Sequence, residues 1–427
     1  MTPKILNTAS GAKLICLSTD QFKCELLGLT YLFPSETISN QQNAAVLSLS
    51  QHGTENYPSR QALSLRCDDL YSTLVSLRNR TFGDMQMLGI TAEFLGERYV
   101  GTPGGLLPDV VSLLSEMLRS PYLENGVYPD EAVELTKRMM GDGIRSMLKN
   151  PRVAATQNCM ELLCPGEGCT ENLPAALDSL QAMTAKTLTA RFAAVKNEIC
   201  PLFFYIGNTD GETVANLLSA AFSFRASPVP FSAKLATPKG EPRTAAIRMP
   251  VAQSRLVLGF RGELSLSHPL APAALYLNEI FGGSPASKLF LRVREEKGLC
   301  YQCSSTLDIY KGVLLAGAGI AAEKRAVAEE SMLAQYEAIC RGEISDTEFE
   351  AARQSLSFIY RQIYDSPVSL ADFYVKRTLS GTFCTPTEWR RRLAAVTKAE
   401  VVAAAQCFTL GAVSFVEGTK PGGEEEE

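Results

Sequence analysis

The sequence predicts an α+β protein of two homologous halves, each an antiparallel-rich sheet packed with long helices. Residues 130–151 and residues 346–367 carry the same signals. Each segment starts with a polar cap and an acidic first turn, continues as an apolar stripe, and stops at a proline that cannot extend a helix. The offset is the same at both ends, since 346 − 130 = 216 and 367 − 151 = 216. Equal offsets indicate a duplicated unit.

A second similarity follows each long helix. Leu180 corresponds to Leu393 in matching helical segments, with an offset of 393 − 180 = 213. An apolar strand candidate comes next, at residues 203–206 and at residues 413–416, and a glycine closes each strand. The order long helix, helix, capped helix, strand therefore occurs twice in register.

Composition predicts where the halves meet. Residues 227–242 concentrate prolines and small polar side chains without a helical period, which is typical of a linker. We therefore expect an N-terminal domain at 1–226 and a C-terminal domain at 243–420. Residues 421–427 are like-charged and have nothing to bury, so we expect a disordered acidic tail there.

The elements of the second half can be read in order. Two strand-like runs begin at Thr244 and Ser254. Residues 287–297 are typical of a helix, with Gly298 as the residue that ends it. The stretch that follows, from Cys300, alternates like a strand. We therefore interpret the spacing of Cys300 and Cys303 as packing in a strand and not as a redox motif.

Composition also excludes several classes of function. The chain has 427 residues, of which 46% are hydrophobic and 20% charged, as in ordinary globular proteins. The net charge of −5 and the scattered basic residues argue against a nucleic-acid partner. The sequence has neither an apolar signal region nor an apolar window long enough for a membrane span. We expect a cytoplasmic protein whose twelve cysteines are reduced.

Residues 284–305, called the grip segment below, read SPASKLFLRVREEKGLCYQCSS. Together with the glycine turn before them, they resemble the substrate-binding segment of the pitrilysin/insulinase superfamily of zinc peptidases. The resemblance covers nearly the whole chain and includes half-length members such as mitochondrial processing peptidase subunits. It implies that Arg294 and Tyr301, seven residues apart, contact the backbone of an extended peptide. A guanidinium and a phenol are suitable donors to peptide carbonyls. The alternative places Arg294 in a surface ion pair and Tyr301 in a core.

The same resemblance indicates that the zinc ligands of the family are missing from this chain. Zinc peptidases of this family need H-x-x-E-H, but the chain has only two histidines, His52 and His268, which are 268 − 52 = 216 residues apart. Counting back from the Gly-Thr turn that follows the zinc helix places the motif on residues 44–48, AAVLS. The downstream glutamate ligand falls on Gly143. We therefore expect no catalytic residue, no metal and no cofactor, and we interpret His52 as an exposed polar residue.

The resulting hypothesis is a non-catalytic peptidase homologue that binds extended peptide and pairs with a zinc-bearing paralogue, or with a second copy of itself, to form a chamber. The chain also resembles bacterial proteins associated with the 5-aminopentanol modification of elongation factor P. One alternative is a structural subunit of a larger complex without proteolysis. Another is an active hydrolase with relocated ligands, whose candidates are acidic and thiol groups: Cys159, Glu161, Cys164 and Cys169.

Overall fold

The computed structural model describes residues 3–101, 104–198, 200–224 and 228–419. The acidic tail expected at 421–427 lies outside the described residues. The chain forms two compact units, each assembled from several segments. Unit 1 contains Met1–Arg145, Asn172–Ser232 and Ile363–Thr385, and unit 2 contains Ser146–Glu171, Ala233–Gln362 and Pro386–Glu427. The linker expected at 227–242 stays a prediction.

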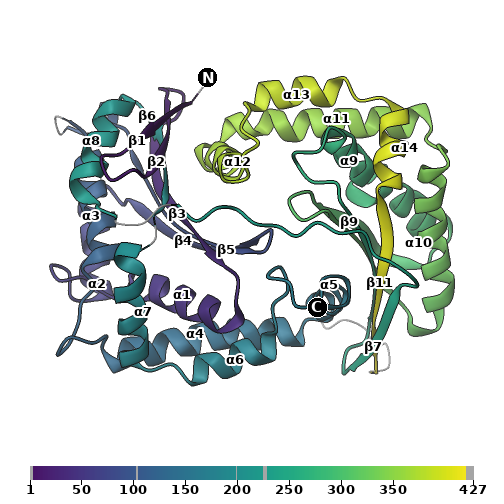
Figure 1. The fold of residues 1–427 in the computed structure, drawn as a ribbon, viewed down its shortest axis with the longest axis horizontal. Coiled ribbons are helices and arrows are strands. Elements are labelled where there is room, and N and C mark those ends of the chain that lie inside the picture. Colours follow the sequence, from purple (N-terminus) through teal and green to yellow (C-terminus); the bar gives the residue numbers. More distant parts are fainter. Residues whose placement is uncertain (1–2, 102–103, 199, 225–227, 420–427) are drawn as a thin grey trace. The chain divides into compact units, whose positions relative to one another are not determined.

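Unit 1 is built on a six-stranded sheet with the order β1-β2-β6-β3-β5-β4 (Figure 1). Its strands are β1 (Lys4–Asn7), β2 (Lys13–Ser18), β3 (Cys24–Pro34), β4 (Leu74–Phe82), β5 (Met85–Leu95) and β6 (Leu202–Gly207). Its helices are α1 (Thr37–Leu49), α2 (Arg60–Asp69), η1 (Glu97–Tyr99), α3 (Leu107–Arg119), most of α4 (Asp130–Lys149), α6 (Leu173–Gln181), α7 (Ala185–Glu198), α8 (Gly211–Ala221), η5 (Ile363–Asp365) and α12 (Pro367–Leu379).

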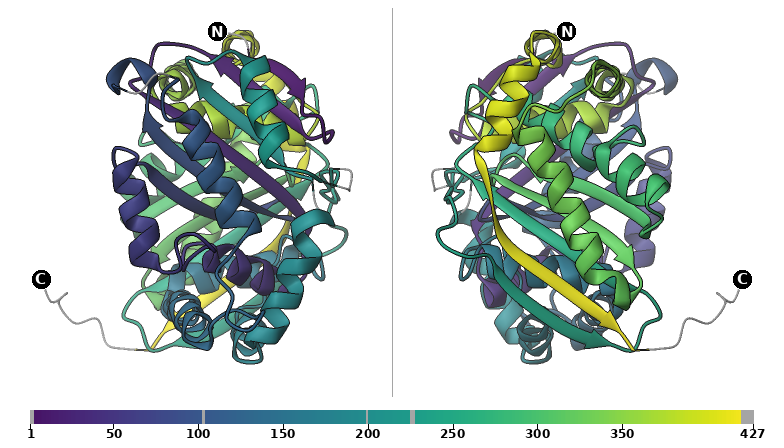
Figure 2. Two further views of the ribbon diagram at one scale, coloured as in Figure 1. Left: turned by 90° about the vertical axis from the view of Figure 1, so that its left-hand side faces the viewer. Right: turned by 90° about the vertical axis from the view of Figure 1, so that its right-hand side faces the viewer.

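Unit 2 is built on a five-stranded sheet with the order β7-β11-β8-β10-β9. Its strands are β7 (Arg243–Met249), β8 (Ser254–Gly262), β9 (Cys300–Asp308), β10 (Val313–Ile320) and β11 (Phe408–Gly418). The long yellow strand in the right panel of Figure 2 is β11, which pairs with β7 on one side and β8 on the other. Its helices are α5 (Pro151–Leu163), α9 (Ala271–Asn278), the π-helices η2 (Glu279–Gly283) and η3 (Leu289–Glu296), η4 (Ala322–Lys324), α10 (Arg325–Cys340), α11 (Asp346–Gln362), α13 (Pro386–Ala394) and α14 (Lys398–Gln406).

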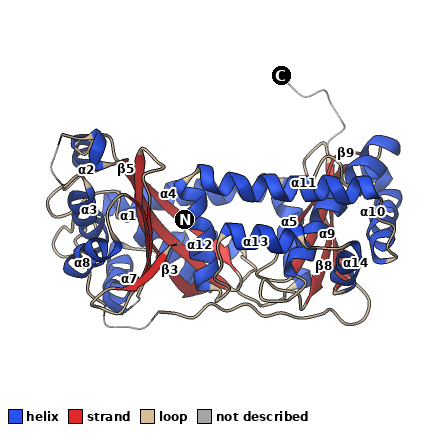
Figure 3. Cartoon of the chain, turned by 90° about the horizontal axis from the view of Figure 1, so that it is seen from above, coloured by secondary structure: helices blue, strands red, loops and turns tan. Residues whose placement is uncertain are grey.

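The two sheets confirm the predicted duplication. Apart from β1, the strand order of unit 1 corresponds position by position to that of unit 2. In each sheet one parallel pair, β2 with β6 or β7 with β11, is followed by antiparallel neighbours to the far edge. Helices lie on both faces of each sheet (Figure 3). The predicted α+β class with two homologous halves is therefore correct.

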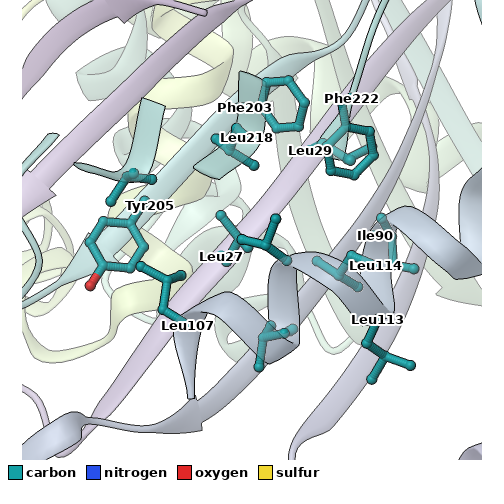
Figure 4. Close-up of a cluster of buried hydrophobic side chains, with 14 of the residues drawn as sticks. Leu27, Leu29, Ile90, Leu107, Leu113, Leu114, Phe203, Tyr205, Leu218 and Phe222 are labelled. Carbon is teal, nitrogen blue, oxygen red and sulfur yellow. The ribbon is translucent and has the colours of Figure 1, made fainter. Parts of the chain in front are cut away.

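The main core of unit 1 lies between its sheet and helices α3 and α8. Apolar residues of β3, β5 and β6 alternate toward these helices, as the pleat of a strand requires. Figure 4 shows this cluster, in which the residues below are 5% exposed or less. Its labelled members are Leu27, Leu29, Ile90, Leu107, Leu113, Leu114, Phe203, Tyr205, Leu218 and Phe222.

The prolines that were predicted to end the two long helices begin new ones. Helix α4 runs up to its proline, whereas α11 ends at Gln362 and is followed by η5 before Pro367. Helix α4 ends at Lys149 and α5 begins at Pro151, while α12 begins at Pro367. The residues before these prolines, Asn150 and Ser366, are extended and their side chains cap the new helices. Helix α5 comes from the first half of the sequence but covers the sheet of unit 2, and α12 comes from the second half but covers the sheet of unit 1. Each unit thus contains a sheet-covering α-helix from the other half.

Candidate functional site

Residues 44–48, on which the resemblance places the zinc motif, lie in the last turns of helix α1. Ala44, Ala45 and Leu47 on this helix are 9%, 0% and 7% exposed. They pack apolar surface and offer no ligand atom. On α4, Gly143 is exposed and has no side chain. These residues do not fit a zinc ion, which needs imidazole, thiolate or carboxylate ligands.

Amide side chains fill the interior next to this position. Asn43, 3% exposed, donates to Gln86 Oε1 at 3.0 Å and accepts from Arg191 Nε at 2.8 Å. Gln86 in turn donates to the Asn40 carbonyl at 2.9 Å and to Asn79 Oδ1 at 3.1 Å. Sequence reasoning missed this network, although the polar run at 40–43 in a helix with a buried face was a signal. Its buried polar groups are paired with one another, which favours a structural role.

His52 is half-buried, so the expectation of an exposed residue was wrong. Its Nε2 lies 3.3 Å from Thr136 Oγ1. Burial and then the positive charge of Arg60 lower the pKa of His52 below its ordinary value. The imidazole is therefore neutral near pH 7 and serves as a hydrogen-bond partner.

The first part of the grip segment contains the π-helix η3 of unit 2. Leu289 and Val293 of η3 are fully buried. Lys288, at the start of the helix, contacts both carboxylate oxygens of Glu348, at 2.9 and 3.2 Å. Gly298 ends the helix with a φ of 56°, and its N–H donates to the Arg294 carbonyl at 3.0 Å. The predicted helix and its glycine stop are both correct.

Arg294 contacts an aromatic ring but forms no close ion pair among the described residues. Its guanidinium lies 4.5 Å from the centroid of the Phe290 ring. Its Nε is 3.6 Å from Glu295 Oε1, a long contact between partly exposed groups that contributes little. The side chain is 37% exposed. Its forked donors therefore stay available to a ligand.

Tyr301 lies at an irregular point of an edge strand. In the pairing of β9 with β10, Ile320 faces Cys300 and Gly319 faces Gln302, so Tyr301 is an extra residue in the ladder. Such bulges re-aim a side chain. Tyr301 is 85% exposed, which contradicts the alternative that placed it in a core. Beyond β9 the sheet has no further strand among the described residues, so this edge is open to pairing.

The two cysteines of the grip segment lie side by side on β9. A hydrogen bond from Cys303 lowers the pKa of the Cys300 thiol, against the opposing effect of burial, and nearby Arg294 and Lys324 act in the same direction. The hydrogen bond and burial raise the pKa of Cys303. The interpretation of this pair as packing stays a prediction.

The relocated-ligand candidates are only partly brought together. Cys164, Glu167 and Cys169 place ligand atoms within 4.8 Å of one another. Cys159 is instead part of the core under α5, where burial raises its pKa to about 12, and Glu161 is exposed. Sequence reasoning missed Glu167, which a search for Cys-x-x-Glu-x-Cys spacing would have included.

The charges around this trio do not suit a metal ion. Glu167 contacts Arg261 Nη2 and Lys311 Nζ, each at 2.6 Å, and the two cationic side chains are 5% and 0% exposed. The carboxylate is thus neutralised already, and a divalent cation would be repelled by two buried positive charges. A hydrogen bond with Cys169 and these two cations lower the pKa of Cys164. The cluster is better described as a buried ion network.

These features define a class of protein: a duplicated peptidase-type fold that has an open strand edge with arginine and tyrosine donors but lacks the metal ligands. Residues 201–356 match the family described as Peptidase M16 inactive domain. The chain is 22% identical over 406 residues, 95% of both chains, to the "Probable inactive metalloprotease YmfF" of Bacillus subtilis. The chain is thus similar over nearly its whole length to an inactive metalloprotease, and its second half matches a family of M16 peptidases.

Two further similarities are informative. The "Uncharacterized zinc protease YmxG" of Bacillus subtilis is 32% identical over 106 residues, which are 24% of this chain and 26% of that protein. A conserved protein from Enterococcus faecalis V583 has the same fold over 99% of this chain and 100% of its own, with a TM-score of 0.90 and 21% identity. No helix among the described residues is long and apolar enough to cross a bilayer.

Proposed function

We propose that this chain is a non-catalytic member of the family that binds an extended peptide at the free edge of β9. The observation that carries the proposal is the contrast between the two parts of the site. The grip segment keeps exposed donors at Arg294 and Tyr301, while residues 44–48 and Gly143 offer no zinc ligand. A peptide that adds to a sheet edge gains main-chain hydrogen bonds and leaves carbonyls for such donors.

The chain pairs, in this proposal, with a zinc-bearing paralogue in the cytoplasm. A peptide-binding edge without a metal has no hydrolysis to perform alone, so the second chain supplies the metal. A second copy of this chain is the other possible partner. The similarity both to an inactive metalloprotease and to a zinc protease of one bacterium supports the paralogue. Obligate interfaces between two chains typically bury about 2,000 Å² or more of accessible surface.

The partner is tested on native material. Light scattering should give a mass near twice 46.3 kDa, and mass spectrometry should find a second chain with an H-x-x-E-H segment. Elemental analysis should place the zinc in the partner and none in this chain. A monomer under gentle lysis, or about one tightly bound zinc in this chain, would contradict the proposal.

Peptide binding is tested by substitution in the assembled protein. Arg294→Ala should weaken peptide capture more than Tyr301→Ala, because hydrogen bonds to charged groups contribute about 1.5–3 kcal/mol and neutral ones about 1 kcal/mol. Arg292→Ala is the matched control, since Arg292 lies on the same helix, is 52% exposed and pairs with Glu296. The same loss in Arg292→Ala as in Arg294→Ala would point to a general charge effect or to damage of the helix.

The more specific form of the proposal links the complex to the 5-aminopentanol modification of elongation factor P. It is supported by the sequence resemblance alone. The mass of elongation factor P should change when the gene for this chain is deleted and return when it is restored. An unchanged mass would remove this link and leave peptide binding intact.

A further inference from the structure

A hollow lies on the face of the unit 2 sheet that α5 covers. Along β10 the side chains that point to this face are those of Val313 and Leu315, which pack with the core under α5. The next two positions on the same face are Gly317 and Gly319, which have no side chains. A cavity of about 250 Å³ lies beside Gly317. The glycines thus end the apolar packing and leave space.

Two arginines line this hollow, and neither has a counter-ion among the described residues. Arg255 lies on β8 directly opposite Gly319, and a Cβ atom at residue 319 would stand 2.7 Å from its Nη1. Arg152 is the second residue of α5. Neither guanidinium forms an ion pair or a hydrogen bond within the part of the chain that the structure describes, and Arg255 Nε is buried without a partner.

The two charges disfavour one another. Burial and then repulsion by Arg152 lower the pKa of Arg255, which nevertheless stays charged near pH 7 because arginine titrates so high. A buried N–H without an acceptor, such as Arg255 Nε, is costly. Arg152 is exposed and adds a second positive charge at the mouth of the hollow. An anion between the two guanidinium groups would accept from Arg255 and offset the repulsion between them. Guanidinium groups match carboxylates geometrically through paired N–H donors.

The rest of the lining favours an organic carboxylate. Gln302, Ser304 and Thr306 of the edge strand β9 line the same hollow and offer amide and hydroxyl donors. Val257 and Leu315 supply an apolar floor. A side chain or chain end that carries both methylene groups and a carboxylate satisfies both kinds of lining. Because the polar lining comes from the strand with the open edge, a peptide is the occupant that the geometry favours.

We propose that this hollow is a carboxylate-binding site in which Arg152 and Arg255 hold an acidic side chain or the free C terminus of a peptide. The proposal rests on the proposed function, which it makes more specific: the bound peptide is acidic at one position or ends there. Gly317 and Gly319 keep the space open, and the donors of β9 orient the carboxylate.

The test uses the full chain and three fluorescently labelled octapeptides of serine, alanine and valine, measured by anisotropy. The first has one central glutamate and an amidated C terminus, the second has glutamine there and a free C terminus, and the third has glutamine and an amidated terminus. Whichever carboxylate the site takes, that peptide should bind about ten- to hundredfold more tightly than the third. The first two peptides distinguish a side chain from a chain end.

Three variants test whether the preference for the carboxylate peptide arises from the hollow. Arg152→Gln with Arg255→Gln should abolish the preference for the carboxylate, and Gly317→Val should reduce it by filling the space at unchanged charge. Arg248→Gln removes one exposed charge, 79% accessible, from β7 of the same sheet and should preserve the preference. Equal binding of the three peptides, or the same loss in Arg248→Gln, would overturn the proposal.

Two outcomes distinguish binding in the hollow from binding by the grip segment. If Tyr301→Ala weakens all three peptides equally and the arginine variants weaken none, the edge binds peptide and the hollow is not a carboxylate site. If the arginine variants remove the preference and Tyr301→Ala changes nothing, the hollow stands and the proposed grip is wrong. Thermal unfolding of each variant checks that it is folded.

Discussion

Helix α12 in unit 1 and helix α5 in unit 2 both begin at a proline and both cover one face of a sheet, yet different interactions hold them there. Leu370, Ala371, Tyr374 and Val375 of α12 pack with strand residues in one continuous apolar cluster. A void of only about 30 Å³ lies under this helix.

Helix α5 instead has small side chains in its middle and polar features at both ends. Ala155 and Cys159 meet the sheet at the centre of the helix. The hollow of about 250 Å³ lies near its first residues, and the buried ion network around Glu167 follows its last turn. A helix that covers one face of a sheet thus occurs twice. Under α12 the interface is filled by apolar packing, and beside α5 it contains a cavity lined by arginines. The second arrangement is the one in which we propose that a carboxylate binds.

The largest effect should come from breaking the ion network of unit 2. Glu167→Gln leaves Arg261 and Lys311 buried without a counter-charge, which costs about 3–5 kcal/mol. Urea unfolding followed by the fluorescence of Trp389 measures it, since this buried residue is the only tryptophan and lies in unit 2. Arg145→Gln, which removes an exposed pair with Asp142, is the control. A loss below about 1 kcal/mol would mean that solvent reaches the network.

The same network makes the stability of unit 2 depend on pH. Burial disfavours the ionised carboxylate of Glu167, but hydrogen bonds from Arg261 and Lys311 outweigh it and lower the pKa. The stabilisation is therefore complete above the ordinary glutamate pKa of about 4.3 and is lost as the pH falls through the lower folded value. The unfolding free energy of the parent should fall in that range, and that of Glu167→Gln should fall less. Parallel curves would show that other carboxylates dominate.

In unit 1 the corresponding substitution creates a cavity under α12. Leu370 is fully buried under α12, so Leu370→Ala should cost about 2–5 kcal/mol. Far-UV circular dichroism during urea unfolding measures it, and Val368→Ala, at a half-buried position of the same helix, should cost less. The loss should stay constant as the pH falls below about 4.3, where that of Glu167→Gln shrinks. A similar pH dependence would erase the distinction between the two helices.

A glycine of unit 1 gives the next smaller effect. Gly28 on β3 faces α12, where a Cβ atom would collide with the Phe204 ring and stand 2.8 Å from the Ile90 carbonyl oxygen. Gly28→Ala should therefore destabilise the protein by about 1–3 kcal/mol through overpacking. Gly101→Ala, where the added atom meets nothing within 4 Å, serves as the control. A neutral Gly28→Ala would show that the Phe204 ring can move aside.

The sequence predicted local elements better than their assignment to units. Pro151 was recognised as the end of a long helix, because a proline and its cap determine the backbone nearby, whereas the helix that was predicted to reach Pro367 ends at Gln362. The same residues begin α5 and α12, but caps do not report which sheet a helix covers. That choice depends on apolar faces that meet only in the folded chain.

The candidate site residues also differ in how far the sequence predicts them. Arg294 and Tyr301 stand seven residues apart in one segment, so a motif could indicate both. Arg152 and Arg255 come from different halves and approach one another only because α5 crosses to the second sheet. That neither has a counter-ion in the described part of the chain is likewise a property of the fold. No pattern in the sequence distinguishes them from other arginines.

The smallest effect, and the sharpest comparison with Gly28, is expected at Gly317. This glycine also lies in a strand and faces the covering helix, but a Cβ atom there would meet only Leu256 O and Val257 Cγ2, each at an ordinary 3.7 Å. Gly317→Ala should thus leave stability unchanged or raise it by up to about 1 kcal/mol, because alanine loses less backbone freedom on folding. Urea unfolding of Gly28→Ala and Gly317→Ala under identical conditions should give effects of opposite sign, or one loss and no change. A loss above about 1 kcal/mol at Gly317 would mean that the hollow closes in solution, and unit 2 would then be packed as tightly as unit 1.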